Sequence, residues 1–374
     1  MAATEDEQQA PEGSGSEAPA PARRVGVLAK FALLVGSLVV VLLLVEVGFR
    51  FAGYGPDKHL RWFAHPELHY APAPNQRGVV RVADKKAGDV EVEIFINSHG
   101  QRSEDYALEK EPGEFRVIAL GDSLTFGPGV SNEHTFVSVA QADFRARPPA
   151  EGSVRLVNTA CNGYSTVHYL RWMETQMDTY EPDLMLVCLF IGNDMCIATR
   201  QTLFNPVPWP SVTRNTAFGH YLLENHRALL TKWAQAMADE NEPTLLEPID
   251  PELRKYVNVP EGKLGYDEKT RLWRHSLGHM ERMLEIAKER DTPIACLLIP
   301  QSHMVSKDND FPLLSWVRRA VERMGIPVID LVEPLQPLGM EGWHPYDPGH
   351  LNVDGHAAVG AALADGLREL GYGN

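Results

Sequence analysis

The feature that most constrains the fold is a series of five short apolar runs that begins near residue 115. They read FRVIAL, VRLVNTA, LMLVCLF, PIACLLI and IPVID. Stretches with helical spacing lie between and around them, at about residues 135–147, 167–179, 267–290 and 312–324. Nearly continuous apolar character is typical of parallel strands that are covered on both faces. The sequence therefore predicts an α/β fold, a three-layer α/β/α sandwich with a parallel sheet.

A much longer apolar run, VGVLAKFALLVGSLVVVLLLVEVGF, stands near the N-terminus and contains only two charged residues, Lys30 and Glu46. As a helix, residues 25–49 would measure about 37 Å, enough to cross a hydrocarbon layer of about 30 Å. Charges near the ends of such a helix can reach the polar boundary. We predict an uncleaved transmembrane anchor. A cleaved signal peptide is the alternative, disfavoured because the preceding tail is long and no A-x-A-like site follows.

The flanks of this run bear on topology. Residues 1–24 consist mostly of Ala, Pro, Gly, Ser and acids without an aromatic residue, which predicts a disordered acidic tail. The basic residues on the two sides are nearly balanced, so their distribution hardly discriminates. An anchor this close to the N-terminus, followed by one long globular region, usually places that region outside the cytoplasm. We expect a single-pass membrane protein with an extracytoplasmic catalytic domain, periplasmic in a Gram-negative cell.

Charge and cysteine content exclude some classes of function. The net charge of −15 argues against nucleic acid as a partner, because no basic face would neutralise phosphates. The cysteines form no C-x-x-C pair, which removes the usual zinc and redox patterns, and no disulfide is suggested. Two of them stand inside apolar runs and are expected to be buried. The four cysteines are Cys161, Cys188, Cys196 and Cys296.

Two segments fall outside the repeating pattern. Residues 50–114 are rich in Pro, Gly and aromatics, and include DVEVEIFINSHGQR, whose alternation predicts a strand with Val90, Val92, Ile94 and Ile96 on one face. We expect a linker and an edge-strand extension there. Residues 199–264 exceed a simple crossover and contain NPVPWP. They are predicted to form a cap inserted into a catalytic domain at 115–374.

Polar residues and glycines follow the first three apolar runs directly. In open parallel sheets ligands bind beyond the carboxyl ends of the strands, so these residues should share one rim. Acyl transfer needs a nucleophile and hydrogen-bond donors for the tetrahedral oxyanion. Ser123 offers the hydroxyl, and the N–H groups of Ser123 and Gly163 with the Asn193 amide can donate. The segments are GDS at 121–123, NTACNG at 158–163 and GND at 192–194.

A base is expected near the C-terminus, in WHPYDPGHLNVDGHAAVG. Asp347 and His350 stand three residues apart on a Pro-Gly turn before the last predicted helix. Such a turn can bring the carboxylate to one imidazole nitrogen while the other nitrogen faces Ser123. Asn352 or Asp354 would cap the helix.

These blocks, in this order, resemble the SGNH (GDSL-type) serine hydrolases over about residues 115–370. The matching segments are Gly121-Asp122-Ser123-Leu124, Gly163, Gly192-Asn193-Asp194 and Asp347-x-x-His350. The resemblance implies a flavodoxin-like fold. It also implies Ser123 as nucleophile, His350 as base, Asp347 as its orienter, and Ser123, Gly163 and Asn193 as the oxyanion hole.

Two departures qualify the resemblance. Ile191 stands where the family's G-x-N-D block has its first glycine. Upstream, INSHGQRSEDY is similar to the N-x-x-G-x-R-x-x-E stretch of membrane-anchored bacterial members, with Asp105 in place of the final Glu.

The serine motif is not the G-x-S-x-G elbow of the α/β-hydrolases, because Thr125 occupies the position of the second glycine.

Three functional hypotheses follow. The first is a membrane-anchored serine esterase acting on an ester or acetyl ester of an envelope glycan or lipid. The second is an O-acyltransferase that uses the same residues to move an acetyl group to a saccharide. The third is a non-catalytic anchored binding module that keeps the fold and uses its rim for recognition. For Ser123 itself, the structural alternative is that it only caps the following helix. No cofactor and no metal site are expected, because His344, His350 and His356 lack the H-x-x-x-H spacing of one helix face. His303 should face the same rim.

Overall fold

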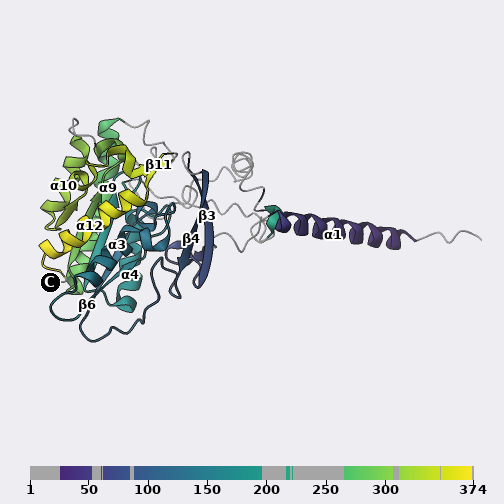
Figure 1. Ribbon diagram of the computed structural model, residues 1–374, viewed down its shortest axis with the longest axis horizontal. Coiled ribbons are helices and arrows are strands. Elements are labelled where there is room, and N and C mark those ends of the chain that lie inside the picture. The colour runs from purple at the N-terminus through teal and green to yellow at the C-terminus, as the bar shows by residue number, and fades with distance from the viewer. Residues whose placement is uncertain are drawn as a thin grey trace, which may run out of the picture.

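The computed structural model describes residues 26–52, 60, 62–84, 88–195, 216–219, 221, 265–305, 311–345 and 347–372. A long helix, α1, projects from a body in which helices surround a central sheet (Figure 1). The predicted tail at 1–24, most of the predicted cap at 199–264 and Cys196 lie outside the described residues.

The five apolar runs form one parallel sheet with the strand order β6-β5-β7-β8-β9. Counted along the chain within this sheet, the order is 2-1-3-4-5, which is the flavodoxin-like order. The prediction of a parallel α/β sheet is confirmed. The strands are β5 Glu114–Leu120, β6 Ser153–Asn158, β7 Leu184–Phe190, β8 Ile294–Ile299 and β9 Val328–Asp330.

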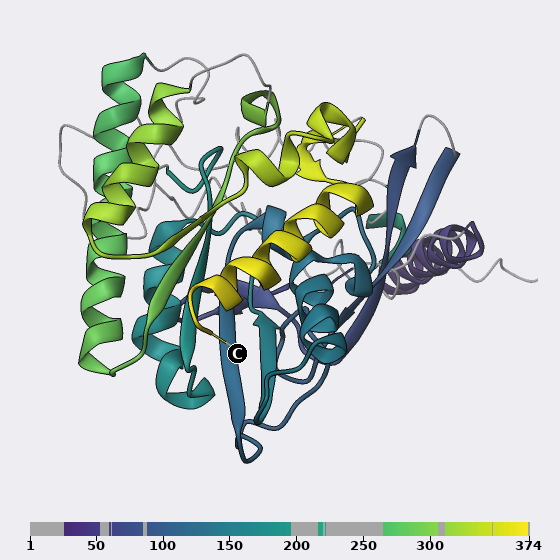
Figure 2. The ribbon, with the colours of Figure 1, turned by 60° about the vertical axis from the view of Figure 1, so that its left-hand side comes forward.

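Helices cover both faces of the sheet (Figure 2). Alternate residues of β5 belong to different apolar clusters: Val117 and Ala119 pack with α3 and α12, whereas Ile118 and Leu120 pack with α4, α9 and α10. This alternation follows from the two-residue repeat of a strand and requires apolar residues at every position. The three predicted layers are therefore present. The covering helices are α3 Phe136–Ala146, α4 Thr166–Tyr180, α9 Tyr266–Glu289, α10 Pro312–Arg323 and α12 Val353–Glu369.

The predicted edge strand lies elsewhere. It forms β4, which pairs antiparallel with β3 in a separate two-stranded sheet rather than at the edge of the central one. The physical reason is where its apolar face is buried: Ile94 and Ile96 pack against Phe126 and Ala160, which follow β5 and β6. The other small elements are β1 Trp62–His65, β2 His69–Pro72, β3 Gln76–Asp84, β4 Gly88–Ile96, β10 Trp343–His344, β11 Asp347–Leu351, α2 Ser123–Phe126, α11 Val332–Leu335, and the 3₁₀ turns η2 Asn132–His134, η5 Ser302–Val305 and η6 Gly339–Gly342.

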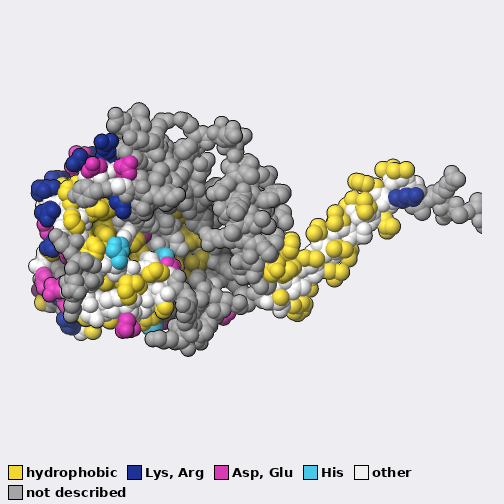
Figure 3. Space-filling view, turned by 90° about the horizontal axis from the view of Figure 1, so that it is seen from above, with side chains coloured by type: hydrophobic (Ala, Val, Ile, Leu, Met, Phe, Trp, Pro, Cys, Tyr) yellow, Lys and Arg dark blue, Asp and Glu magenta, His cyan; other side chains and the backbone are white. Residues whose placement is uncertain are grey.

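Helix α1, Val27–Phe51, coincides closely with the predicted anchor. Its mean hydropathy reaches 2.7, and apolar side chains cover most of the side that Figure 3 shows. Its length and composition fit either a membrane span or a signal sequence. Near its C-terminal end, the Glu46 carboxylate accepts the N–H of Ala217 at 2.8 Å and pairs with Arg50 at 2.8 Å. The ring of Phe49 lies 5.3 Å from that of Phe218.

Candidate active site

Ser123 stands at the corner between β5 and α2. Asp122 is the N-cap of α2, since its Oδ1 accepts the N–H of Leu124 at 2.8 Å, so the hydroxyl of Ser123 is not used for capping. The corner requires glycine at 121, because a Cβ there would lie 2.1 Å from Oγ1 of Thr125. Gly127 ends α2 in the left-handed region at φ 74°. The helix-cap interpretation of Ser123 is therefore wrong.

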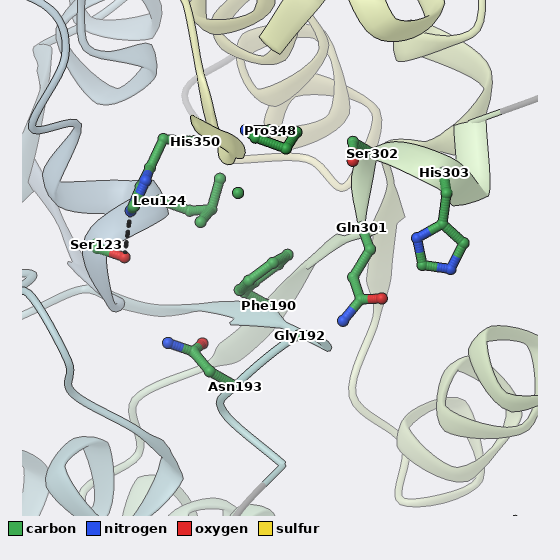
Figure 4. Close-up of a pocket in the computed structure, with 11 residues that line it drawn as sticks. Ser123, Leu124, Phe190, Gly192, Asn193, Gln301, Ser302, His303, Pro348 and His350 are labelled. Carbon is green, nitrogen blue, oxygen red and sulfur yellow. Dashed lines mark hydrogen bonds between the residues drawn. The ribbon is translucent and has the colours of Figure 1, made fainter. Parts of the chain in front are cut away.

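His350 and Asp347 come from β11, which pairs with β10. Nε2 of His350 lies 2.8 Å from Oγ of Ser123, and Nδ1 lies 2.6 Å from Oδ2 of Asp347. Figure 4 shows the imidazole directed at the serine hydroxyl. The side chain of His350 is 23% exposed and that of Asp347 is 59% exposed. The three predicted residues thus form one hydrogen-bonded chain, although Ser123 and His350 are 227 positions apart in the sequence.

Asn193 lies in the turn that follows β7, the neighbour of β5 in the sheet. It lines the same pocket as Ser123 (Figure 4). The next residue, Asp194, is fully buried and holds this turn: Oδ2 accepts the N–H of Phe190 at 2.7 Å and Oδ1 accepts the hydroxyl of Tyr169 at 2.9 Å. Burial raises the pKa of Asp194 well above its ordinary value.

Gly163, the other predicted donor, lies in the loop that follows β6, and its φ of 77° is in the left-handed region that favours glycine. It is not among the residues that line the pocket. The structure therefore brings Ser123, Asn193, Asp347 and His350 together, and leaves Gly163 in a turn at the same end of the sheet.

The pocket has a volume of about 380 Å³ and two kinds of wall. Leu124, Phe190 and Pro348 supply apolar surface, whereas Gln301, Ser302 and His303 supply polar groups from the segment after β8. The expectation that His303 faces the rim is confirmed. The sequence did not indicate Phe190, Gln301 or Ser302 as pocket residues, although the end of β8 was recognisable as part of the same rim.

His356 of α12 is buried beneath this region. Its Nδ1 accepts the N–H of Phe136 at 3.1 Å, and burial lowers its pKa to about 3, so the ring is neutral. It serves as a packed residue of the helix rather than as a titrating or ligating group. Within the described part of the chain, no group of three or more His, Cys, Asp or Glu side chains is arranged to hold a metal ion.

This arrangement suits acyl transfer. An imidazole that accepts a serine proton on one nitrogen, while a carboxylate holds the other nitrogen, makes the serine oxygen a nucleophile. A carboxamide beside it can donate to a developing oxyanion.

A family of known hydrolases agrees with this chemistry. The family described as GDSL-like Lipase/Acylhydrolase matches residues 119–358. A search of curated proteins found no match. Similar solved structures include an esterase, EstA, from Pseudoalteromonas sp. (12% identity, 68% of this chain and 97% of that one, TM-score 0.37). They also include a lipase/acylhydrolase from Enterococcus faecalis (16%, 68% and 96%, 0.39) and an acetyl xylan esterase from Geobacillus stearothermophilus (13%, 70% and 96%, 0.39).

Because the family match spans more than half of the 374 residues, the chain belongs to the GDSL-like lipase/acylhydrolase family and is a serine ester hydrolase.

Proposed function

We propose that this protein is a membrane-anchored esterase whose catalytic triad is Ser123, His350 and Asp347. The observation that carries the proposal is the continuous hydrogen-bonded chain: 2.8 Å from Ser123 Oγ to His350 Nε2 and 2.6 Å from His350 Nδ1 to Asp347. The serine opens directly onto the pocket.

The reaction proceeds in two halves. His350 Nε2 takes the hydroxyl proton as Ser123 Oγ attacks the ester carbonyl, and the oxyanion receives the N–H of Ser123 and the Asn193 amide. Collapse expels the alcohol, which takes the proton from His350, and leaves an acyl-serine. Water then gives a proton to His350 as its oxygen attacks the acyl carbon; collapse releases the acid, and His350 returns the proton to Ser123 Oγ. Asp347 keeps the imidazole in the required tautomer throughout.

The substrate is an ester or acetyl ester of an envelope glycan or lipid, and the catalytic domain lies outside the cytoplasm. An anchor, rather than a cleaved signal sequence, is supported by the contacts of α1 with the rest of the chain. Glu46 accepts N–H groups of Ala217, and the ring of Phe49 packs 5.3 Å from Phe218 and 4.7 Å from Tyr221. A helix that is removed during export would not be expected to contact Ala217, Phe218 and Tyr221 of the mature chain.

The test is labelling of the full chain in detergent micelles with a fluorophosphonate probe, beside Ser123→Ala. Ser131→Ala is the matched control: Ser131 Oγ also lies 2.8 Å from a histidine nitrogen, that of His134, with Glu133 at 3.9 Å, but not at this pocket. We expect labelling of wild type and Ser131→Ala, and none of Ser123→Ala. Labelling that survives in Ser123→Ala would refute the assignment.

The same preparations distinguish hydrolysis from acyl transfer. Aryl acetate is offered with and without an oligosaccharide acceptor, and both released acetate and acetylated saccharide are measured. An esterase releases acetate at a rate that the acceptor does not lower, whereas an O-acyltransferase forms acetylated saccharide at the expense of acetate. A folded wild type that does neither and is not labelled would point to a binding module.

A further inference from the structure

Arg102 is a buried cation whose guanidinium binds backbone carbonyls of a neighbouring segment. Its side chain is fully buried. Nη1 donates to the carbonyls of Phe126 and Gly127, Nη2 donates to that of Val130, and Nε lies 3.3 Å from Oδ1 of Asn132. Among the ion pairs of the described residues, none joins Arg102 to a carboxylate. Burial lowers its pKa to about 9, which still leaves the guanidinium charged at neutral pH.

The carbonyls that Arg102 binds belong to the end of the helix that carries Ser123. Helix α2 has only four residues, so its last carbonyls have few partners inside the helix. Asn158 donates to the carbonyl of Thr125 at 2.8 Å, and Arg102 takes the next two carbonyls. The Cζ atom of Arg102 also lies over the ring of Phe126, 5.0 Å from its centre. These contacts fix α2 along and about its axis.

The position of Arg102 is itself fixed by the segment from Asn97 to Asp105, which lies upstream of the serine motif. Oδ1 of Asn97 accepts the N–H groups of His99 and Gln101, and Gly100 turns the chain at φ 78°. Asp105, which replaces the family's Glu, accepts the N–H of Ser98 at 2.7 Å. The N–H of Arg102 donates to Asn158 at the end of β6. Every motif residue therefore shapes or anchors the turn that presents the guanidinium.

We propose that Arg102 is a positioning residue for Ser123. By binding the carbonyls of Phe126, Gly127 and Val130, at and just after the end of α2, it sets the distance and direction of Ser123 Oγ toward Nε2 of His350. The stretch from Asn97 to Asp105 is then part of the catalytic unit. This inference rests on the proposed role of Ser123 as nucleophile. It identifies no additional group that touches the substrate.

The first test compares Arg102→Lys with Arg116→Lys in the full chain in detergent. Arg116 is also fully buried and donates to the carbonyls of Leu108 and Tyr180, but it lies near the start of β5, away from the serine. Lysine keeps the charge and loses the planar fork in both variants. Fluorophosphonate titration counts competent sites, and kcat and KM for an aryl acetate are then expressed per titrated site.

A misplaced nucleophile lowers the rate of chemistry in molecules that are fully folded. We expect Arg102→Lys to lose about 10²-fold in kcat per titrated site, with little change in KM. Arg116→Lys should lose thermal stability or titratable sites, with kcat per site preserved. If Arg102→Lys keeps kcat per site within about twofold of wild type, or loses only sites and stability as Arg116→Lys does, the proposal is wrong.

A milder variant decides the matter if Arg102→Lys does not fold. Asn132 is partly exposed, and Asn132→Ala removes the oxygen that faces Nε of Arg102, together with two hydrogen bonds to the backbone of Phe95, while leaving the buried cation in place. We expect a roughly fivefold lower kcat per site, about the net contribution of the hydrogen bond to Arg102, and an unchanged value would overturn the proposal. Failure of wild type to be labelled at Ser123 would instead refute the proposed function itself.

Discussion

Replacement of Asp347 should cost much less activity than a buried triad carboxylate would. When His350 takes the serine proton, a positive imidazolium forms beside the carboxylate, with 2.6 Å between Nδ1 and Oδ2. For charge centres about 4 Å apart the attraction is about 1 kcal/mol in water and about 4 kcal/mol near a protein surface. Because the Asp347 side chain is 59% exposed, we take an intermediate value of about 2 kcal/mol, which is roughly 30-fold in rate.

The assay is kcat for an aryl acetate, per fluorophosphonate-titrated site, in Asp347→Ala and Asp347→Asn. We expect a roughly 30-fold loss in the alanine variant and a larger loss in the asparagine variant, whose amide can hold the wrong tautomer. Asp354→Asn is the control, since Asp354 is exposed on the first turn of α12 and should leave kcat unchanged. Two results would refute the reasoning: a loss of less than about threefold, or one as large as that of Ser123→Ala.

Three other predictions concern the oxyanion donor, the buried acid and the packing of glycines. Asn193→Ala should lower kcat by about 10²- to 10³-fold with KM nearly constant, and a parallel rise in KM would show that the amide binds the ground state instead. Burial raises the pKa of Asp122 to about 6 from 3.8, so the folded protein binds this proton more tightly than the unfolded chain, and the free energy of unfolding falls as pH rises from about 4 to 6. Relative to wild type, Asp122→Asn should gain about 2 kcal/mol across that window in urea unfolding, and a pH-independent difference would contradict the assignment. Gly355→Ala should lower the free energy of unfolding by about 1–3 kcal/mol, because the added Cβ would lie 2.1 Å from the carbonyl oxygen of Gly342. Gly278→Ala, in open space on α9, should raise it by about 0.5–1 kcal/mol. Equal effects of the two variants on the urea midpoint would show that the packing argument fails.

Local patterns were sufficient to predict the central sheet. A strand that is covered on both faces needs apolar residues at every position, and each of the five runs became one. The rim followed from this, since residues after neighbouring parallel strands must meet, as Ser123 and Asn193 do. Motif order located His350 and Asp347, which no periodic pattern distinguishes from other turn residues.

Contacts between distant segments could not be predicted in this way. The alternation of β4 indicated a strand but did not say which surface would bury Ile94 and Ile96, so the hairpin was mistaken for a sheet edge. Likewise the sequence marked Arg102 only as part of a motif. Its partners are the backbone carbonyls of Phe126, Gly127 and Val130, and every residue type carries a backbone carbonyl. The side chains of these residues therefore do not indicate that their backbone carbonyls bind an arginine.

The most direct test of the central claim is to identify the residue that a fluorophosphonate modifies in the full chain. Labelled wild-type protein is digested, and the modified peptide is sequenced by mass spectrometry, with Ser123→Ala treated in parallel. The account predicts one phosphonyl group per chain, on Ser123 in the segment GDSLTF, and loss of both labelling and aryl ester hydrolysis in the variant. Modification of another residue, or hydrolysis that persists in folded Ser123→Ala, would contradict it.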